Sequence, residues 1–196
     1  PAINISGSGL PLVDSLMASA VSISRTDCIL YVNADIVLAP NILSITGEIQ
    51  AEFNSYLVSG RRLNFHWKTP GLQSDLSVDE VLARASKTGE IAGYEWIDYF
   101  IFNRKLFGKI PPFSLGRCAW DNWLLAEAWK RGARLVDATE GITAVHLNHD
   151  YGHAREKTAE GVWAGGDARE NYRLAGGDLF DLMDARYLFR KGTLIR

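Results

Sequence analysis

Apolar and polar residues along the chain group into blocks that predict a helix followed by a strand. From residue 11 the apolar positions Leu12, Leu16, Met17 and Val21 recur at helical spacing. A continuous apolar run then covers residues 28–32 and leads directly into polar residues. Such runs are typical of strands buried on both faces of a parallel sheet, so we expect a core strand here.

The same patterns continue over the rest of the chain. Helices are predicted at residues 41–52, 78–86, 119–131, 168–174 and 179–188, and strands at residues 53–58, 97–102, 135–136 and 142–147. Strands that alternate with helices favour an α/β fold with a layered sheet of mixed direction. We expect a core over residues 1–151, with residues 152–196 forming a C-terminal helical extension packed on it.

Composition narrows the class of protein. The 196 residues, 47% hydrophobic and 22% charged, are ordinary for one globular domain, and a net charge of −2 argues against a nucleic-acid binder. No apolar run approaches the roughly 20 residues that span a bilayer, and no signal sequence is visible. We expect a cytoplasmic protein, with peripheral membrane association left open. Because the chain starts with Pro1, we also expect processing or trimming from a longer chain.

The core strand runs into Asn33, Ala34 and Asp35. Ligands of α/β sheets bind beyond the carboxyl ends of the strands, and two oxygen-bearing side chains at i and i+2 can turn toward one hard cation. Mg²⁺ and Mn²⁺ favour such oxygen ligands and can bridge to substrate phosphates. The alternative is an Asx turn that closes the strand, aided by Pro40.

A second candidate is Asp121, in the first turn of the helix predicted at residues 119–131. The positive end of the helix dipole favours its ionised form, and an ionised carboxylate there could accept a proton from a sugar hydroxyl. The alternative is that Asp121 only complements the dipole, with Trp120 and Trp123 as core residues.

Further candidates follow the last core strand. His146 and Asn148 share one side of an extended backbone, and a turn after them would let His149 or Asp150 converge there, so that imidazole could complete a metal shell begun by Asp35. The alternative is that these histidines have only a structural role.

Three arginines could contact a diphosphate: Arg61, Arg62 and Arg117. Four tryptophans could stack on sugar rings or fill the core: Trp67, Trp96, Trp120 and Trp123.

Four segments together resemble the GT-A class of nucleotide-sugar glycosyltransferases. They are residues 31–36, 98–102, 116–123 and 146–151, and the resemblance covers roughly residues 10–151 in the right order. It implies a GT-A-like, Rossmann-like mixed sheet flanked by helices. It also implies a nucleotide-sugar donor, a glycan or other hydroxyl acceptor, and Mn²⁺ or Mg²⁺ as cofactor.

The resemblance also implies roles for individual residues. Asp35 would bind the metal ion together with His146 or His149, and Asp121 would be the base, which favours inversion. Asn33, Arg61 and Arg117 would contact the donor, and Trp120, Asn122 and Trp123 the acceptor.

The chain departs from the class at two places. Asn33 replaces the first of the usual paired aspartates. Little more than one short strand precedes the helix at residue 11, whereas the class begins with a strand, a helix and a strand that hold the nucleotide base. We therefore expect either an upstream domain of the same chain or an incomplete donor site.

Two other classes of function stay open. A non-catalytic carbohydrate-binding or scaffolding domain with a transferase-derived fold would tolerate Asn33 and a short N-terminus. A nucleotidyltransferase would share the sheet and the metal ion, but it usually needs a glycine-rich, basic N-terminal loop, which is not visible here. The preferred hypothesis is a metal-dependent glycosyltransferase.

Overall fold

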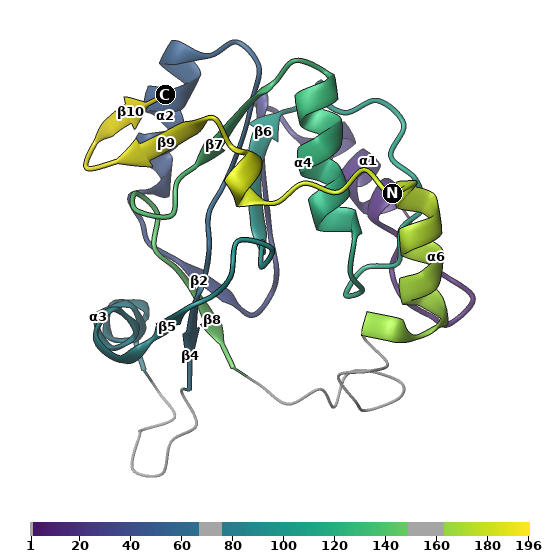
Figure 1. Cartoon of the computed structure of the whole chain (residues 1–196), viewed down its shortest axis with the longest axis horizontal. Helices are drawn as coiled ribbons and strands as arrows, with labels where there is room; N and C mark the ends of the chain where they lie inside the picture. Colours follow the sequence, from purple (N-terminus) through teal and green to yellow (C-terminus); the bar gives the residue numbers. More distant parts are fainter. Residues whose placement is uncertain (1, 67–75, 149–162) are drawn as a thin grey trace.

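The computed structural model describes residues 2–66, 76–148 and 163–196 (Figure 1). The helices are α1 (Val13–Ile23), α2 (Ile42–Glu52), α3 (Val78–Thr88), α4 (Trp120–Lys130), α6 (Gly166–Ala175) and the 3-10 turn η1 (Leu182–Asp184). The strands are β1 (Cys28–Val32), β2 (Ile36–Leu38), β3 (Tyr56–Ser59), β4 (Leu63–Phe65), β5 (Glu90–Ile91), β6 (Tyr99–Asn103), β7 (Arg134–Asp137), β8 (Ala144–Leu147), β9 (Tyr187–Arg190) and β10 (Thr193–Ile195).

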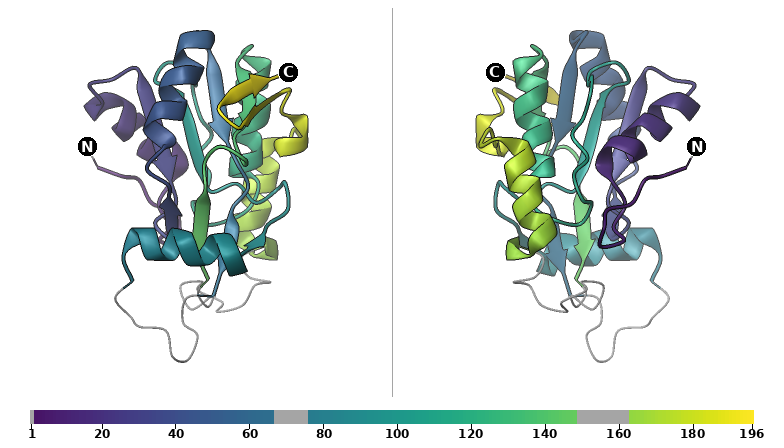
Figure 2. Two further views of the ribbon diagram at one scale, coloured as in Figure 1. Left: turned by 90° about the vertical axis from the view of Figure 1, so that its left-hand side faces the viewer. Right: turned by 90° about the vertical axis from the view of Figure 1, so that its right-hand side faces the viewer.

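These strands form two sheets of mixed direction. The larger sheet has the order β1-β6-β3-β7-β9-β10, and the smaller one has the order β2-β8-β4-β5. The pairs β3–β7, β7–β9 and β4–β8 are parallel, and the others are antiparallel. Helices lie on both sides of the larger sheet (Figure 2). The expected α/β fold with a mixed sheet flanked by helices is therefore confirmed.

The two faces of the larger sheet are buried by different helices. Side chains alternate along a strand, so Leu57 and Phe100 join α1 and α4 in one cluster, whereas Val58 and Ile101 pack with α2 on the other face. This double cover explains why β3 is buried at every position. The helices predicted around α1, α2, α3 and α4 are confirmed.

The expectation of a buried, parallel strand at residues 28–32 is wrong. This segment is β1, which lies at the edge of the larger sheet and pairs only with β6, in the antiparallel direction. Leu30 and Val32 are 45% and 37% exposed. An apolar run alone does not separate an edge strand from a central one, because the difference lies in which segment pairs beside it.

The tail of the chain also differs from the sequence prediction. The helix expected near residues 168–174 is α6, but residues 179–188 form only η1 and the start of β9. Asp181 and Asp184 cap this single turn reciprocally, and Phe189 is then buried in the core as β9 pairs with β7. The described part of the expected helical extension thus adds one α-helix and two strands to the fold.

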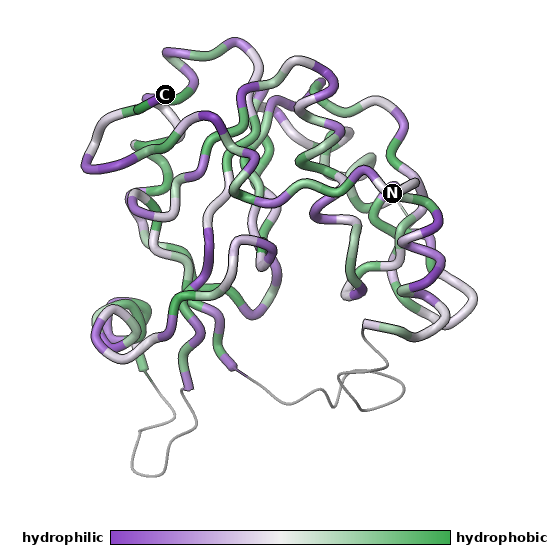
Figure 3. The backbone as a smooth tube through the Cα atoms, in the orientation of Figure 1, coloured by the Kyte–Doolittle hydropathy of each residue, from purple (hydrophilic) through white to green (hydrophobic). Residues whose placement is uncertain are grey.

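The helices carry both hydrophilic and hydrophobic residues, as α6 shows in Figure 3. Within the described ranges, no helix combines the length and the apolar character that crossing a membrane requires.

Candidate functional site

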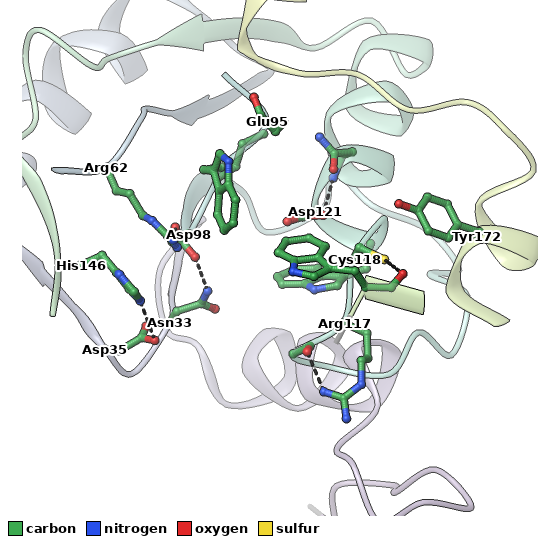
Figure 4. Close-up of a pocket in the computed structure, with 16 residues that line it drawn as sticks. Asn33, Asp35, Arg62, Glu95, Asp98, Arg117, Cys118, Asp121, His146 and Tyr172 are labelled. Atoms are coloured by element: carbon green, nitrogen blue, oxygen red, sulfur yellow. Dashed lines mark hydrogen bonds and ion pairs between the residues drawn. The ribbon is translucent and has the colours of Figure 1, made fainter. Parts of the chain in front are cut away.

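One cavity of about 460 Å³ gathers most of the residues that the sequence analysis singled out (Figure 4). It lies where β1 ends and α4 begins. Its lining includes the predicted residues Asn33, Asp35, Arg62, Trp96, Arg117, Trp120, Asp121, Asn122 and His146, together with Glu95, Asp98, Cys118, Trp163 and Tyr172. Three segments that are far apart in the sequence therefore share one cavity.

Asn33 is held by hydrogen bonds through both ends of its side chain. Its amide nitrogen donates to Asp98 Oδ1 at 2.7 Å, and its amide oxygen accepts from the Tyr31 hydroxyl at 2.7 Å. Burial, reinforced by the nearby carboxylates, raises the pKa of Tyr31 well above its usual range, so the phenol remains a donor. Asn33 thus fixes the end of β1 against the start of β6.

Asp98 also forms a buried ion pair with Arg62. Its Oδ2 lies 2.7 Å from Arg62 Nη1, and the two side chains are only 10% and 11% exposed. Arg62 also donates to Asn64 and lies over the indole of Trp96, with 4.6 Å between the guanidinium carbon and the ring centroid. The sequence alone assigns no role to Asp98. A charged residue at the start of an apolar strand was the one available signal.

Asp35 and His146 meet because β2 and β8 are paired. Ile36 lies opposite His146 in the register, and this places His146 Nε2 3.3 Å from Asp35 Oδ2. His146 Nδ1 lies 2.8 Å from Asn148 Oδ1, while the amide nitrogen of Asn148 faces His66. A proton on Nδ1 would be donated to Asn148 and leave the Nε2 lone pair for a cation, whereas a proton on Nε2 would be donated to Asp35.

In the tautomer with the proton on Nδ1, the two side chains would offer a carboxylate oxygen and an imidazole nitrogen to one cation. A carboxylate and an imidazole are suitable ligands for Mn²⁺, and Mg²⁺ is often bound by one or two carboxylates plus substrate phosphates. No group of three or more His, Cys, Asp or Glu side chains within residues 2–66, 76–148 and 163–196 could hold a metal ion. The other predicted ligand, His149, lies outside the described residues, as does Trp67.

Asp121 enters the cavity from the first turn of α4. The residue before the helix, Ala119, has a left-handed backbone with φ of 78°, a conformation that is strained for a residue with a side chain. Burial raises the pKa of the Asp121 carboxyl to about 7, opposed by a hydrogen bond from the backbone N–H of Asn122 and reinforced by the negative charge of Asp98. The helix terminus favours the ionised form of Asp121, but desolvation has the larger effect, so the net pKa shift is upward.

The predicted aromatic residues are divided between the cavity and the core. Trp120 lines the cavity and makes an edge contact with Tyr31, whereas Trp123 packs against Phe113 in the core and does not line it. An acceptor contact by Trp123 does not fit this buried position. Trp163, for which the sequence held no signal, lines the cavity instead.

The neighbouring residues Arg61 and Arg62 lie on opposite sides of their segment, as successive residues of extended chain do. Arg62 lines the cavity, but Arg61 lies over the ring of Tyr94 and lines a separate cavity of about 330 Å³ beside Asp137. The predicted donor contact of Arg61 does not fit this position. Arg117 lines the main cavity, where its Nη1 donates to the carbonyl oxygen of Gly116.

The loop before α4 is fastened by α6 through Asn171, which is fully buried. Its side chain accepts from the N–H of Ser114 and donates to the carbonyl oxygens of Ser114 and Cys118, at 2.8 to 3.0 Å. The loop between Ser114 and Cys118 contains Arg117 and leads into the helix that carries Asp121. The C-terminal part of the chain therefore shapes the cavity.

We expect Asn171→Ala to lower the free energy of unfolding by about 2–4 kcal/mol, because it leaves three buried backbone groups without partners. Urea denaturation measures this change. Glu170→Ala, on the exposed side of the same helix, is the control and should have little effect. An Asn171→Ala protein as stable as this control would show that the three bonds do not hold the loop.

No family model matches the chain, and comparisons with curated proteins and with solved structures return no match. The fold class is thus defined by the structure itself, as that of an α/β protein with mixed sheets. Because many α/β folds serve unrelated functions, a function must be argued from the cavity and its side chains.

Proposed function

We propose that this chain is the catalytic part of a metal-dependent glycosyltransferase that moves a sugar from a nucleotide diphosphate donor to a hydroxyl acceptor. The observation that carries the proposal is the arrangement of Asp35, His146, Arg117 and Asp121 around one cavity. A pair of cation ligands, a guanidinium and a carboxylate that titrates near neutral pH are the groups that such a transfer needs. The resemblance of the sequence to the GT-A class supports the same proposal.

The donor diphosphate would lie toward Asp35 and His146. These two side chains would hold Mn²⁺ or Mg²⁺, which when bound neutralises charge on the leaving diphosphate. Arg117 would offer a second positive charge, and a guanidinium can contact two phosphate oxygens at once. Asn33 would act indirectly, because its side chain is already bonded to Tyr31 and Asp98.

The acceptor hydroxyl would approach Asp121. When ionised, this carboxylate can accept the hydroxyl proton as the oxygen attacks the donor sugar. A pKa of about 7 suits this task, since the base is largely ionised at slightly alkaline pH and still holds a proton well. Trp120 offers an apolar surface beside it. A base placed opposite the leaving group favours inversion of the sugar carbon.

The first experiment measures binding of UDP and GDP in the presence of Mn²⁺ by calorimetry. We expect Asp35→Ala to weaken Mn²⁺-dependent binding at least about tenfold, because one of the two metal ligands is lost. Glu48→Ala, an exposed carboxylate on α2, is the control and should bind like the parent chain.

Two outcomes would contradict the proposal. Equal binding by Asp35→Ala and the parent chain would remove Asp35 from the metal site. Failure of the parent chain to bind either nucleotide with Mn²⁺ would favour a non-catalytic carbohydrate-binding domain, an alternative consistent with the lack of a three-ligand cluster in the described residues.

A further inference from the structure

The charges around the cavity are unevenly distributed. Arg62 and Asp98 neutralise each other as a buried ion pair. Of the remaining charged residues, Asp35, Glu95 and Asp121 carry carboxyl groups, whereas Arg117 is the one remaining guanidinium in the described lining. When Asp121 is ionised, the described part of the lining therefore holds more carboxylates than cationic side chains outside the Arg62–Asp98 pair.

The guanidinium of Arg117 is turned away from two of these carboxyl groups (Figure 4). In Figure 4, Asp121 lies between Glu95 and Arg117, and the Arg117 side chain extends away from both carboxyl groups. A cation held by Asp35 and His146 would neutralise charge on the donor phosphates, not on the carboxyl groups of Asp121 and Glu95. The negative charge near Asp121 and Glu95 thus stays uncompensated by the described residues, and a partly closed, apolar-walled cavity concentrates its field.

The walls beside these carboxyl groups are aromatic. The rings of Trp96 and Trp163 pack edge to face with 5.2 Å between their centroids, and Trp163 remains 41% exposed at the cavity. Trp120 lines the same cavity. Indole faces offer apolar surfaces to the C–H groups of a sugar ring, while carboxylates accept hydrogen bonds from its hydroxyl groups.

We infer that this end of the cavity takes a neutral sugar ring and excludes a sugar that carries a carboxylate. A hydroxyl group can donate to Asp121 or Glu95, but a ligand carboxylate has no proton to donate and would be repelled by both, more strongly by Asp121 because Glu95 is exposed to solvent. The inference rests on the proposed function only in naming this sugar as the acceptor.

The test compares matched pairs of methyl glycosides at pH 8. The glucoside, galactoside and mannoside are each paired with the corresponding uronide, which differs by a carboxylate in place of CH₂OH. Binding is followed through the indole N–H signals of Trp96, Trp120 and Trp163, each assigned with a Trp→Phe variant. For at least one pair we expect the neutral member to bind at least about tenfold more tightly.

Variants that lack the cavity carboxylates distinguish electrostatic repulsion of the uronide from a steric mismatch. In the Glu95→Gln/Asp121→Asn protein the preference for the neutral sugar should fall below about threefold, because the repelling charges are gone. Glu48→Gln removes one charge far from the cavity and should keep the full preference.

The inference fails if none of the three pairs shows this preference, if the double variant keeps the preference, or if no glycoside shifts the three indole signals. Its failure is distinguishable from that of the proposed function. Sugar selectivity without nucleotide binding would remove the transferase alone, and nucleotide binding without sugar selectivity would remove this inference alone.

Discussion

Replacement of Asp121 by Asn is expected to reduce sugar transfer at pH 8 by about 10²–10⁴-fold, the usual contribution of a general base. The amide has nearly the same shape but cannot accept the hydroxyl proton. Initial rates with a nucleotide-sugar donor measure the loss, and unchanged nucleotide binding by the variant shows that the donor site is intact. Near-normal turnover would exclude Asp121 as the base.

The pH dependence of transfer should follow the same carboxyl group. Because burial raises the pKa of Asp121 to about 7, the rate of the parent protein should rise between pH 6 and pH 8 as the base ionises. The residual activity of Asp121→Asn should lack this rise. A parent protein whose rate is already constant from pH 5 upward would contradict the assignment.

The same substitution should stabilise the protein at high pH. The pKa of Asp121 is raised on folding, so the folded protein binds its proton more tightly, and stability falls as pH rises from about 4 through 7. Asn cannot ionise and avoids this cost. We expect Asp121→Asn to raise the free energy of unfolding by up to about 4 kcal/mol at pH 8 and to leave it nearly unchanged at pH 4. Urea denaturation at both pH values measures the difference.

A loss of stability at pH 8 would show that the Asp121 carboxylate is stabilised where it lies. If Asp121→Asn is more stable at pH 8 and also loses transfer activity, the buried carboxyl group destabilises the fold but is needed for catalysis. Such a trade-off is common at active sites.

Removal of the Asp98 charge is expected to destabilise the fold by about 3 kcal/mol. In Asp98→Asn the guanidinium of Arg62 stays buried without its counter-ion, and such uncompensated charges are costly. The double variant Arg62→Met/Asp98→Asn should recover much of this loss, since it removes both charges. Urea denaturation of the single and double variants measures the coupling.

The exposed ion pair between Asp27 and Arg104 supplies the control. Asp27 is 88% exposed, with 3.8 Å between the charged groups, so Asp27→Asn should leave stability unchanged within error. If Asp98→Asn is tolerated as well as this control, the buried pair does not hold β6 and the segment around Arg62 together.

The sequence alone determined most of the helices and the position of the polar turns. The apolar spacing in α2 and α4 lies within each helix, so it is readable without knowledge of the fold. The same holds for the polar residues that follow the apolar run of β1, which pointed to Asn33 and Asp35. These features are local, because they depend on neighbours within a few positions along the chain.

Only the tertiary structure decided which segments meet. The edge position of β1 depends on β6, and the strand in the tail depends on β7. Asp98 has its role because Arg62, 36 positions earlier, lies beside it in space.

The chemistry of Asp121 was decided in the same way. The helix terminus favours its charge and is visible in the sequence, but the burial that raises its pKa is supplied by segments packed around the cavity. Desolvation depends on all neighbouring atoms at once, so it arises only when the chain has folded.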